Sequence, residues 1–181
     1  RGFLQWEQHP EFVDNVADLT TGQVTYPEYD SHGHVRKRND GVHELEYIYD
    51  RAERLTQVKD GTGRLLKEFF YHRTNAPGQL SAGKLYQAKR HNYGVPVGPL
   101  PALLAQTDLI VTETYEYGGR GGRVSKRTTA QSNRDARVFR QSFTWDSLGN
   151  LQSSTYPTCL HAPCNPQAAT PTRTVTNLYD T

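Results

Sequence analysis

Two cysteines and a histidine lie within six residues, in the segment Cys159-Leu-His161-Ala-Pro-Cys164. They could supply three metal ligands, but a structural zinc site uses four, and no fourth candidate stands at a recognisable spacing. The cysteines could instead form a local disulfide, which an oxidising compartment favours, or remain free thiols. By loop-closure entropy, a disulfide would stabilise this loop by about 2 kcal/mol. We expect the disulfide, and no metal.

Three histidines cluster near two glutamates and could bind a metal or transfer protons: His32, His34 and His43, with Glu44 and Glu46. In a strand, alternate side chains leave opposite faces, so His43 would lie on one face and the two glutamates on the other. That arrangement does not gather the groups into one site. The sequence therefore predicts a solvated sheet face here.

Aspartates that follow an aromatic residue could be read as a row of catalytic carboxylates. An acid–base pair needs two environments that separate the two pKa values, whereas equivalent positions of a repeat offer the same environment each time. The sequence contains no Gly-x-Ser-x-Gly, no phosphate-binding Walker loop and no His-Glu-x-x-His. The glycine- and arginine-rich segment 118–123 falls inside a predicted turn. We therefore expect no catalytic, cofactor-binding or metal site.

The composition is polar and aromatic together. Hydrophobic residues make up 35% of the 181 residues, a figure that includes 11 tyrosines, and 10% of the chain is aromatic. Because 21 basic residues nearly balance 19 acidic ones, the net charge of +2 does not require nucleic acid or an anionic membrane as partner. No apolar run approaches the roughly 18 residues of a membrane-spanning helix.

A short motif recurs along the chain: an aromatic residue, Asp, two variable residues, Gly, a polar residue and an aliphatic residue. Its copies begin at Tyr29-Asp30, Tyr49-Asp50, Tyr117-Gly118, Trp145-Asp146 and Tyr179-Asp180. Later positions of the motif are filled by Gly33, Leu55, Gly122 and Gly149. A degraded copy starts at Tyr71-His72 and takes Gly78 as its glycine. In the copy at Tyr49 the glycine position holds Glu53, which predicts either a turn without positive φ or a strained one.

The residues before each motif alternate, as in Leu45, Tyr47 and Tyr49, which is the pattern of a β-strand. Asp can accept hydrogen bonds from backbone N–H groups two residues later, and Gly supplies a positive φ. A second set of turns, at Asn39-Asp40-Gly41 and Asp60-Gly61-Thr62-Gly63, closes the next hairpin. The sequence thus predicts an all-β fold of consecutive antiparallel hairpins that form a twisted strip.

We interpret residues 1–181 as one repeat segment with three irregular parts. These are a lead-in over 1–20, a loop-rich insertion over 74–108 that carries one short helix at 100–106, and a loop over 156–171 that holds both cysteines and several prolines.

These residues resemble the YD-repeat, or Rhs-repeat, family, with the clearest copies at Tyr47–Leu65 and Phe143–Leu151. The resemblance implies that the strip is part of a larger shell or β-solenoid-like barrel. Members of the family are large bacterial surface and toxin proteins, including Tc-type toxin shells, and teneurins are their animal relatives. In toxin members the shell encloses a cargo polypeptide, and in teneurin-like members the barrel supports adhesion. The family's self-cleaving region contains Asp-Pro, which is absent from this sequence, so cleavage is not carried over.

We therefore expect a structural segment of a large secreted or surface protein, extracellular and bacterial, and not an enzyme. Its open edges would need neighbouring repeats of the same chain or assembly. An encapsulated polypeptide or a cell-surface glycan or protein would be a further partner. The alternative is a glycan- or protein-binding adhesion module, in which the aromatic ribs stack on a ligand.

Overall fold

The computed structural model describes residues 2–9, 22–94, 108–118, 121–132, 137–160 and 173–179. All regular elements in these ranges are β-strands, and the described part of the chain contains no helix. The described residues therefore include no helix that is long and apolar enough to span a membrane.

The chain divides into two compact units, 1–68 and 69–181. The first unit holds β1 (Trp6–Gln8), β2 (Gln23–Tyr29), β3 (Val35–Asn39), β4 (Glu44–Tyr49) and β5 (Leu55–Asp60). β6 (Leu65–Tyr71) runs across the division between the units. The second unit holds β7 (Leu85–Asn92), β8 (Leu109–Gly118), β9 (Arg123–Gln131), β10 (Val138–Trp145), β11 (Leu151–Thr155), β12 (Thr158–Cys159) and β13 (Thr174–Thr176).

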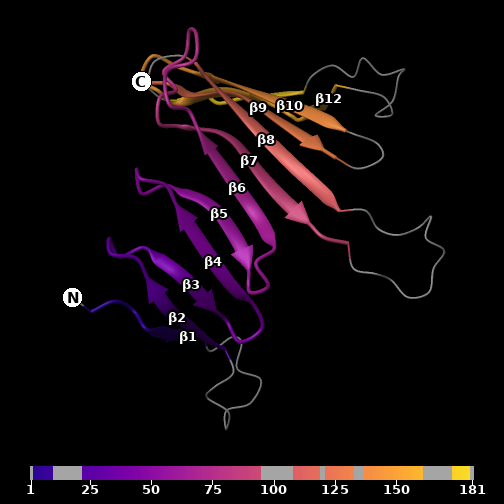
Figure 1. Cartoon of the computed structure of the whole chain (residues 1–181). Helices are drawn as coiled ribbons and strands as arrows, with labels where there is room; N and C mark the ends of the chain where they lie inside the picture. The colour runs from indigo at the N-terminus through magenta and orange to yellow at the C-terminus, as the bar shows by residue number, and fades with distance from the viewer. Residues whose placement is uncertain are drawn as a thin grey trace, which may run out of the picture. The chain divides into compact units, whose positions relative to one another are not determined.

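The strands pair in chain order to give one 13-stranded sheet, β1-β2-β3-β4-β5-β6-β7-β8-β9-β10-β11-β13, with β12 on β10. The pairs whose register is described are all antiparallel, and Figure 1 shows β2 to β5 as successive hairpins. The predicted all-β meander of antiparallel hairpins is confirmed.

The same irregularity, a β-bulge, follows every described turn in which the aspartate N–H donates to the carbonyl of the residue four positions later. The partner register skips one residue directly after the aliphatic position, for example between the pairs Thr144↔Ser153 and Trp145↔Leu151. Equivalent bulges occur beyond the turns that begin at Asp30, Asp50 and Asp60. A β-bulge sharpens the local twist and re-aims the side chains on its strand. The residue before the aspartate and the aliphatic residue after the turn therefore become direct partners, as Trp145 and Leu151 are.

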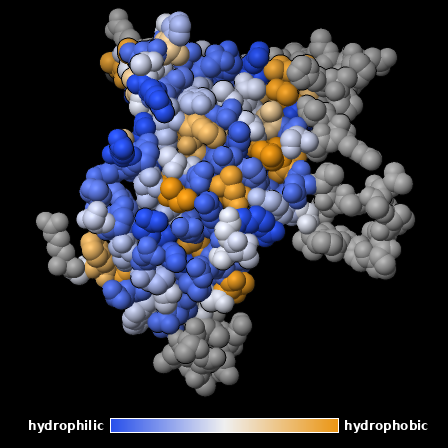
Figure 2. Space-filling model, viewed as in Figure 1, coloured by the Kyte–Doolittle hydropathy of each residue, from blue (hydrophilic) through white to orange (hydrophobic). Residues whose placement is uncertain are grey.

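Burial is shallow throughout the described residues. The buried apolar side chains there are Val24, Val58 and Tyr117, and most other strand residues are half-buried. On the face drawn in Figure 2, apolar residues form small separate spots among polar ones. Because little is fully buried, the sheet depends on its backbone ladders and on cross-strand side-chain pairs, each of which contributes about 0.2–1 kcal/mol.

The structure differs from the sequence prediction within the expected insertion 74–108. Residues 85–92 form β7, which pairs with β8 through Gln87↔Thr114 and its neighbours. The sequence pattern does not predict this strand, because its second half, Lys89-Arg90-His91-Asn92, carries no apolar alternation. The helix expected at 100–106 lies outside the described residues.

Two short strands also lie in segments that were predicted to be irregular. β1 falls in the lead-in and pairs with β2 through Glu7↔Val24. β12 falls in the cysteine-containing loop and pairs with β10 through Phe139↔Cys159.

Candidate functional site

The recurring aspartate turn is the most regular arrangement of polar groups in the described chain. In the copy at Asp146, the Gly149 N–H donates to the Asp146 carbonyl at 3.2 Å, and the Asp146 N–H donates to the Asn150 carbonyl at 3.0 Å. The same two backbone bonds close the turns that begin at Asp30, Asp50 and Asp60. One local sequence pattern therefore produces one turn geometry four times.

The aspartate carboxylate completes each turn. Oδ1 of Asp146 accepts hydrogen bonds from the N–H groups of Leu148 at 2.9 Å and Asn150 at 2.8 Å, while its Oδ2 accepts one from Asn150 Nδ2 at 3.0 Å. The side chain four residues on makes the equivalent Oδ2 bond in the other copies: His34 to Asp30, Arg54 to Asp50 and Arg64 to Asp60. Both oxygens are thus occupied by the turn itself, which leaves the carboxylate a structural role.

These hydrogen bonds keep the aspartates ionised. At Asp60, bonds from the Thr62 hydroxyl and from Arg64 outweigh the opposing effect of burial and lower the pKa to about 2. At Asp30, burial works against ionisation, but bonds from the His34 ring and from the N–H groups of His34 and His32 lower the pKa further. A carboxylate that is already ionised and fully bonded is a poor proton donor or acceptor at neutral pH.

The glycine position adopts a left-handed backbone. The φ angle is +96° at Gly33, +85° at Gly63 and +88° at Gly149. Glu53 takes the same conformation with φ of +62°, and it is the one non-glycine residue with positive φ among those described. Of the two alternatives for this turn, the structure shows the strained one.

Five aromatic residues of the motif connect their copies to the preceding ones, a relationship that the sequence analysis did not anticipate. The Tyr49 hydroxyl donates to the carbonyl of Val35, the aliphatic residue of the copy before, at 3.1 Å. The corresponding donor–acceptor pairs are Tyr117 with Leu85, Trp145 with Val124, and Tyr179 with Leu151. Tyr29 donates in the same way to the carbonyl of Leu4. Trp145 can replace Tyr because its indole N–H is also a donor.

We call the residue between the glycine and aliphatic positions the bridging residue, because it covers the aromatic ring of the next copy. The His34 ring stacks on Tyr49 with ring centroids 4.8 Å apart. Phe3 stacks on Tyr29 at 4.8 Å, and the cations of Lys84 and Arg123 each lie 5.1 Å from the ring centroids of Tyr117 and Trp145. A stacked ring and a cation over a ring are both attractive, so the position tolerates different residue types.

At Gly33, Gly122 and Gly149, the glycine also lies against the bridging residue of the preceding copy. A methyl group on Gly33 would come within 2.9 Å of the Phe3 ring, and one on Gly149 would come within 2.5 Å of the Arg123 guanidinium. Glycine is therefore suited to the position for two reasons: its positive φ and the close approach of the side chain before it. Phe3 follows Gly2 and precedes Leu4, so residues 2–4 repeat the order of glycine, bridging and aliphatic residues.

The copy that begins at Tyr71 uses a different glycine from the predicted Gly78. The His72 N–H donates to the Lys84 carbonyl and the Gly83 N–H donates to the His72 carbonyl, both at 2.9 Å. Gly83 has φ of +77° and immediately precedes Lys84 and β7. The extra residues form a loop inside the turn, where Asn75 Oδ1 accepts the N–H groups of residues 81 and 82 at 2.9 Å. The prediction placed the glycine five residues too early because this loop had no precedent in the other copies.

This loop contacts the next turn of the second unit. Gln79 Oε1 accepts the Tyr117 N–H at 3.0 Å, and Lys84 Nζ donates to the carbonyls of Gly121, at 3.2 Å, and Gly122. Gly121 and Gly122 have φ of +75° and +59°. The predicted motif residue Gly122 therefore lies in the turn, directly under the bridging residue Lys84.

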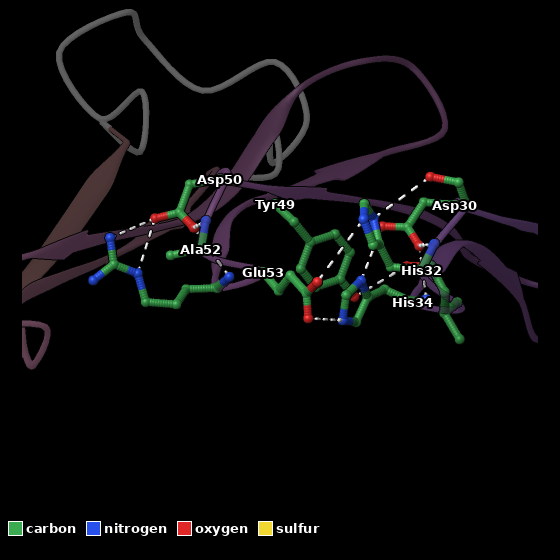
Figure 3. Close-up of polar contacts among 10 residues, drawn as sticks. Asp30, His32, His34, Tyr49, Asp50, Ala52 and Glu53 are labelled. Atoms are coloured by element: carbon green, nitrogen blue, oxygen red, sulfur yellow. Dashed lines mark hydrogen bonds and ion pairs between the residues drawn. The ribbon is translucent and has the colours of Figure 1, made fainter.

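The histidine cluster divides between two places. His32 and His34 both approach Glu53, with Nε2–carboxylate distances of 3.9 Å and 3.8 Å (Figure 3). His43 instead lies 3.5 Å from Asp40. The described residues include no group of three or more His, Cys, Asp or Glu side chains that could hold a metal ion.

Two predicted site residues lie outside the described part of the chain, namely Asp180 and Cys164. Cys159 is disulfide-bonded, while its predicted pairing with Cys164 stays a prediction. His161 also lies outside the described residues.

Comparison with known proteins gives a structural likeness, while family models and curated proteins give no match. No protein-family model matches the chain, and no curated protein matches it. Among solved structures, a chain of the Photorhabdus luminescens Tc holotoxin pore is similar with a TM-score of 0.39 and 15% identity. The match covers 74% of this chain and 9% of that chain, so this chain spans about a tenth of the length of the protein it matches.

Proposed function

We propose that this chain is a structural repeat segment of a large exported protein, in which successive turns build a wall or spacer, and that it has no catalytic role. The observation that carries the proposal is the coupling between copies. Five aromatic residues of the motif donate to a carbonyl of the preceding copy, namely Tyr29, Tyr49, Tyr117, Trp145 and Tyr179. Bridging residues cover rings of the following copy. The polar groups that might do chemistry are used to hold these turns.

A nearest-neighbour architecture suits such a role. In repeat proteins each unit contacts mainly its neighbours, and stability is approximately a sum of unit and interface terms. The shallow burial of the described strands agrees with this, because few side chains contribute to a common core. A wall that encloses cargo or presents a surface needs a large continuous sheet and not a pocket. An architecture of repeats supplies such a sheet by adding units.

The proposed export is supported by a disulfide bond and not by a targeting sequence. Cys159 is disulfide-bonded, and disulfides persist in oxidising compartments such as the periplasm and the extracellular space. A secreted or cell-surface protein is therefore the setting that we propose.

The experiment combines stability with a search for function. The wall role predicts that loss of one coupling bond, as in Trp145→Phe, speeds limited proteolysis of the second unit. It also predicts that the unaltered chain shows no turnover on panels of ester, phosphate, glycoside and peptide substrates. Hydrolysis that co-purifies with folded protein and persists across preparations would overturn the non-catalytic part.

The alternative of an adhesion module is separated by a glycan array. The described exposed aromatics include Trp6 and Tyr156, which are 54% and 57% exposed. Reproducible binding that is lost in Tyr156→Ala, but retained in a variant of equal stability at a buried site, would replace the wall with the adhesion module. A blank array at high protein concentration supports the wall.

A further inference from the structure

Glu53 departs from the motif in a way that brings it to the histidines of the preceding copy. The other described four-residue-spaced turns have glycine at this position, where φ is positive. Glu53 accepts the same backbone conformation and directs its carboxylate toward His34 and His32, at 3.8 Å and 3.9 Å from their Nε2 atoms. Figure 3 shows both rings turned toward this one carboxylate. Its side chain thus lies against His34, the bridging residue of the preceding copy.

The position of the imidazole hydrogen on His34 follows from its other neighbour. Nδ1 of His34 lies 2.9 Å from Oδ2 of Asp30, and an ionised carboxylate only accepts hydrogen bonds. Nδ1 must therefore carry the hydrogen, which leaves Nε2 of the neutral ring as a bare lone pair opposite Glu53. The Nε2 lone pair of His34 and the Glu53 carboxylate are then both hydrogen-bond acceptors, and they do not attract each other. Protonation of Nε2 changes this contact into an ion pair between two successive copies.

The charged and titratable groups around His34 come from three parts of the first unit. Asp30 and His32 belong to the same turn, Glu53 belongs to the following turn, and Tyr49 at the end of β4 stacks on the ring. Two carboxylates therefore face two imidazoles, so that protonation of both rings gives a neutral cluster. An imidazolium over the Tyr49 ring adds a cation–π attraction.

We propose that this junction is a pH-sensitive coupling, in which protonation of His34 and His32 tightens the contact between turn 30–34 and turn 50–54 through Glu53. The inference rests on this geometry alone and goes beyond the wall function. The protonated rings gain a partner in the folded state, so their stabilising contribution is present at lower pH and is lost as the pH rises through the imidazole range. The bridging residues Phe3, Lys84 and Arg123 are not histidines, so their junctions should not respond.

The test is amide hydrogen exchange of the full chain by mass spectrometry at pH 7.5 and pH 5.5, with a chelator present to exclude metal effects. Rates are corrected for the intrinsic pH dependence of exchange, and turn 146–150, which has Asn150 in place of histidine, is the internal reference. Protection of residues 50–54 relative to this reference should rise about two- to fivefold at pH 5.5, the size expected of an exposed ion pair.

Three variants make the outcome decisive. Glu53→Gln should abolish the rise. His34→Phe, which installs the ring found at Phe3, should reduce the rise to the part contributed by His32. His43→Phe is the matched control, because His43 contacts Asp40 and not Glu53, and it should retain the rise. Should Glu53→Gln fold poorly, Glu53→Gly supplies the residue found in the other copies and should also abolish the rise. An unchanged ratio in the unaltered chain, or a rise that survives removal of the Glu53 carboxylate, refutes the proposal.

Discussion

The indole N–H of Trp145 donates to the Val124 carbonyl at 2.8 Å, across the boundary between two copies of the motif. A tyrosine hydroxyl makes the same bond elsewhere, so the donor is preserved while the ring changes. Coupling between copies therefore depends on a polar atom at the tip of the aromatic side chain as well as on its apolar area.

Trp145→Phe should weaken the second unit, because it keeps a ring and removes the donor. The expected loss is about 1 kcal/mol of unfolding free energy, typical of one hydrogen bond. Trp145→Tyr should lose less, since a hydroxyl can reach the same carbonyl. Urea denaturation followed by far-UV circular dichroism measures both, and equal losses for Phe and Tyr would show that the bond contributes nothing.

Neighbouring glycines in one turn allow backbone strain to be separated from close contact. Gly121 and Gly122 both have positive φ, but an added methyl group meets nothing within 4 Å at Gly121, whereas at Gly122 it meets the carbonyl oxygen of Leu80. Gly121→Ala should cost about 1 kcal/mol through strain. Gly122→Ala should cost clearly more, because backbone must move. Thermal denaturation of the two variants is the measurement, and equal melting temperatures would contradict the close packing of loop and turn.

The aspartate turns should loosen in acid within a definite range. The pKa of Asp60 is lowered from 3.8 to about 2 by Thr62 and Arg64. A carboxyl group whose folded pKa is lowered contributes stability above its unfolded pKa, and that contribution is lost as the pH falls through the folded value. Exchange protection of residues 60–64 should therefore fall between about pH 4 and pH 2. Asp60→Asn should remove this acid dependence, and a variant that kept it would point to another group.

Glu53→Gly should stabilise the first unit at pH 7.5, because glycine adopts a positive φ without strain. A non-glycine residue in the left-handed region costs about 1–2 kcal/mol, and the flexibility of glycine in the unfolded chain returns part of this. The net gain should be roughly 0.5–1 kcal/mol by urea denaturation. Glu53→Ala is the control, because it removes the carboxylate and keeps the strain, and it should give no gain.

The fold could be predicted from the sequence because its signals are local. Alternation in segments such as Leu45–Tyr49 fixed the strand type, and Asp with Gly three residues later fixed the turn, since both depend on side chains a few residues apart. β7 was missed because cross-strand pairing with β8 supports it where its own residues carry no apolar alternation. The turn at His72 was misread because closure depends on a bond to Gly83, eleven residues away.

The coupling between copies was beyond sequence reasoning. Tyr117 and Leu85 are separated by 32 residues, and nothing in either segment signals the other. A regular signal was nevertheless present, namely that an aliphatic residue follows each glycine at a constant distance. The acceptor is the backbone carbonyl of this aliphatic residue. A backbone carbonyl is the same for every residue type, so the sequence does not reveal its role. The sequence does not reveal the bridging position either, because an aromatic ring occupies it in some copies and a cationic side chain in others.

The shallow burial of the strands has a consequence for how such a chain can evolve. A protein with a shared interior must adjust many contacts when its length changes, whereas here a duplicated hairpin needs only to match the hairpin on either side. Gene segments that encode one aromatic-to-aliphatic unit could therefore be gained or lost without redesign elsewhere, and the spacing between copies could drift. The loop between His72 and Gly83 is the kind of insertion that this freedom permits.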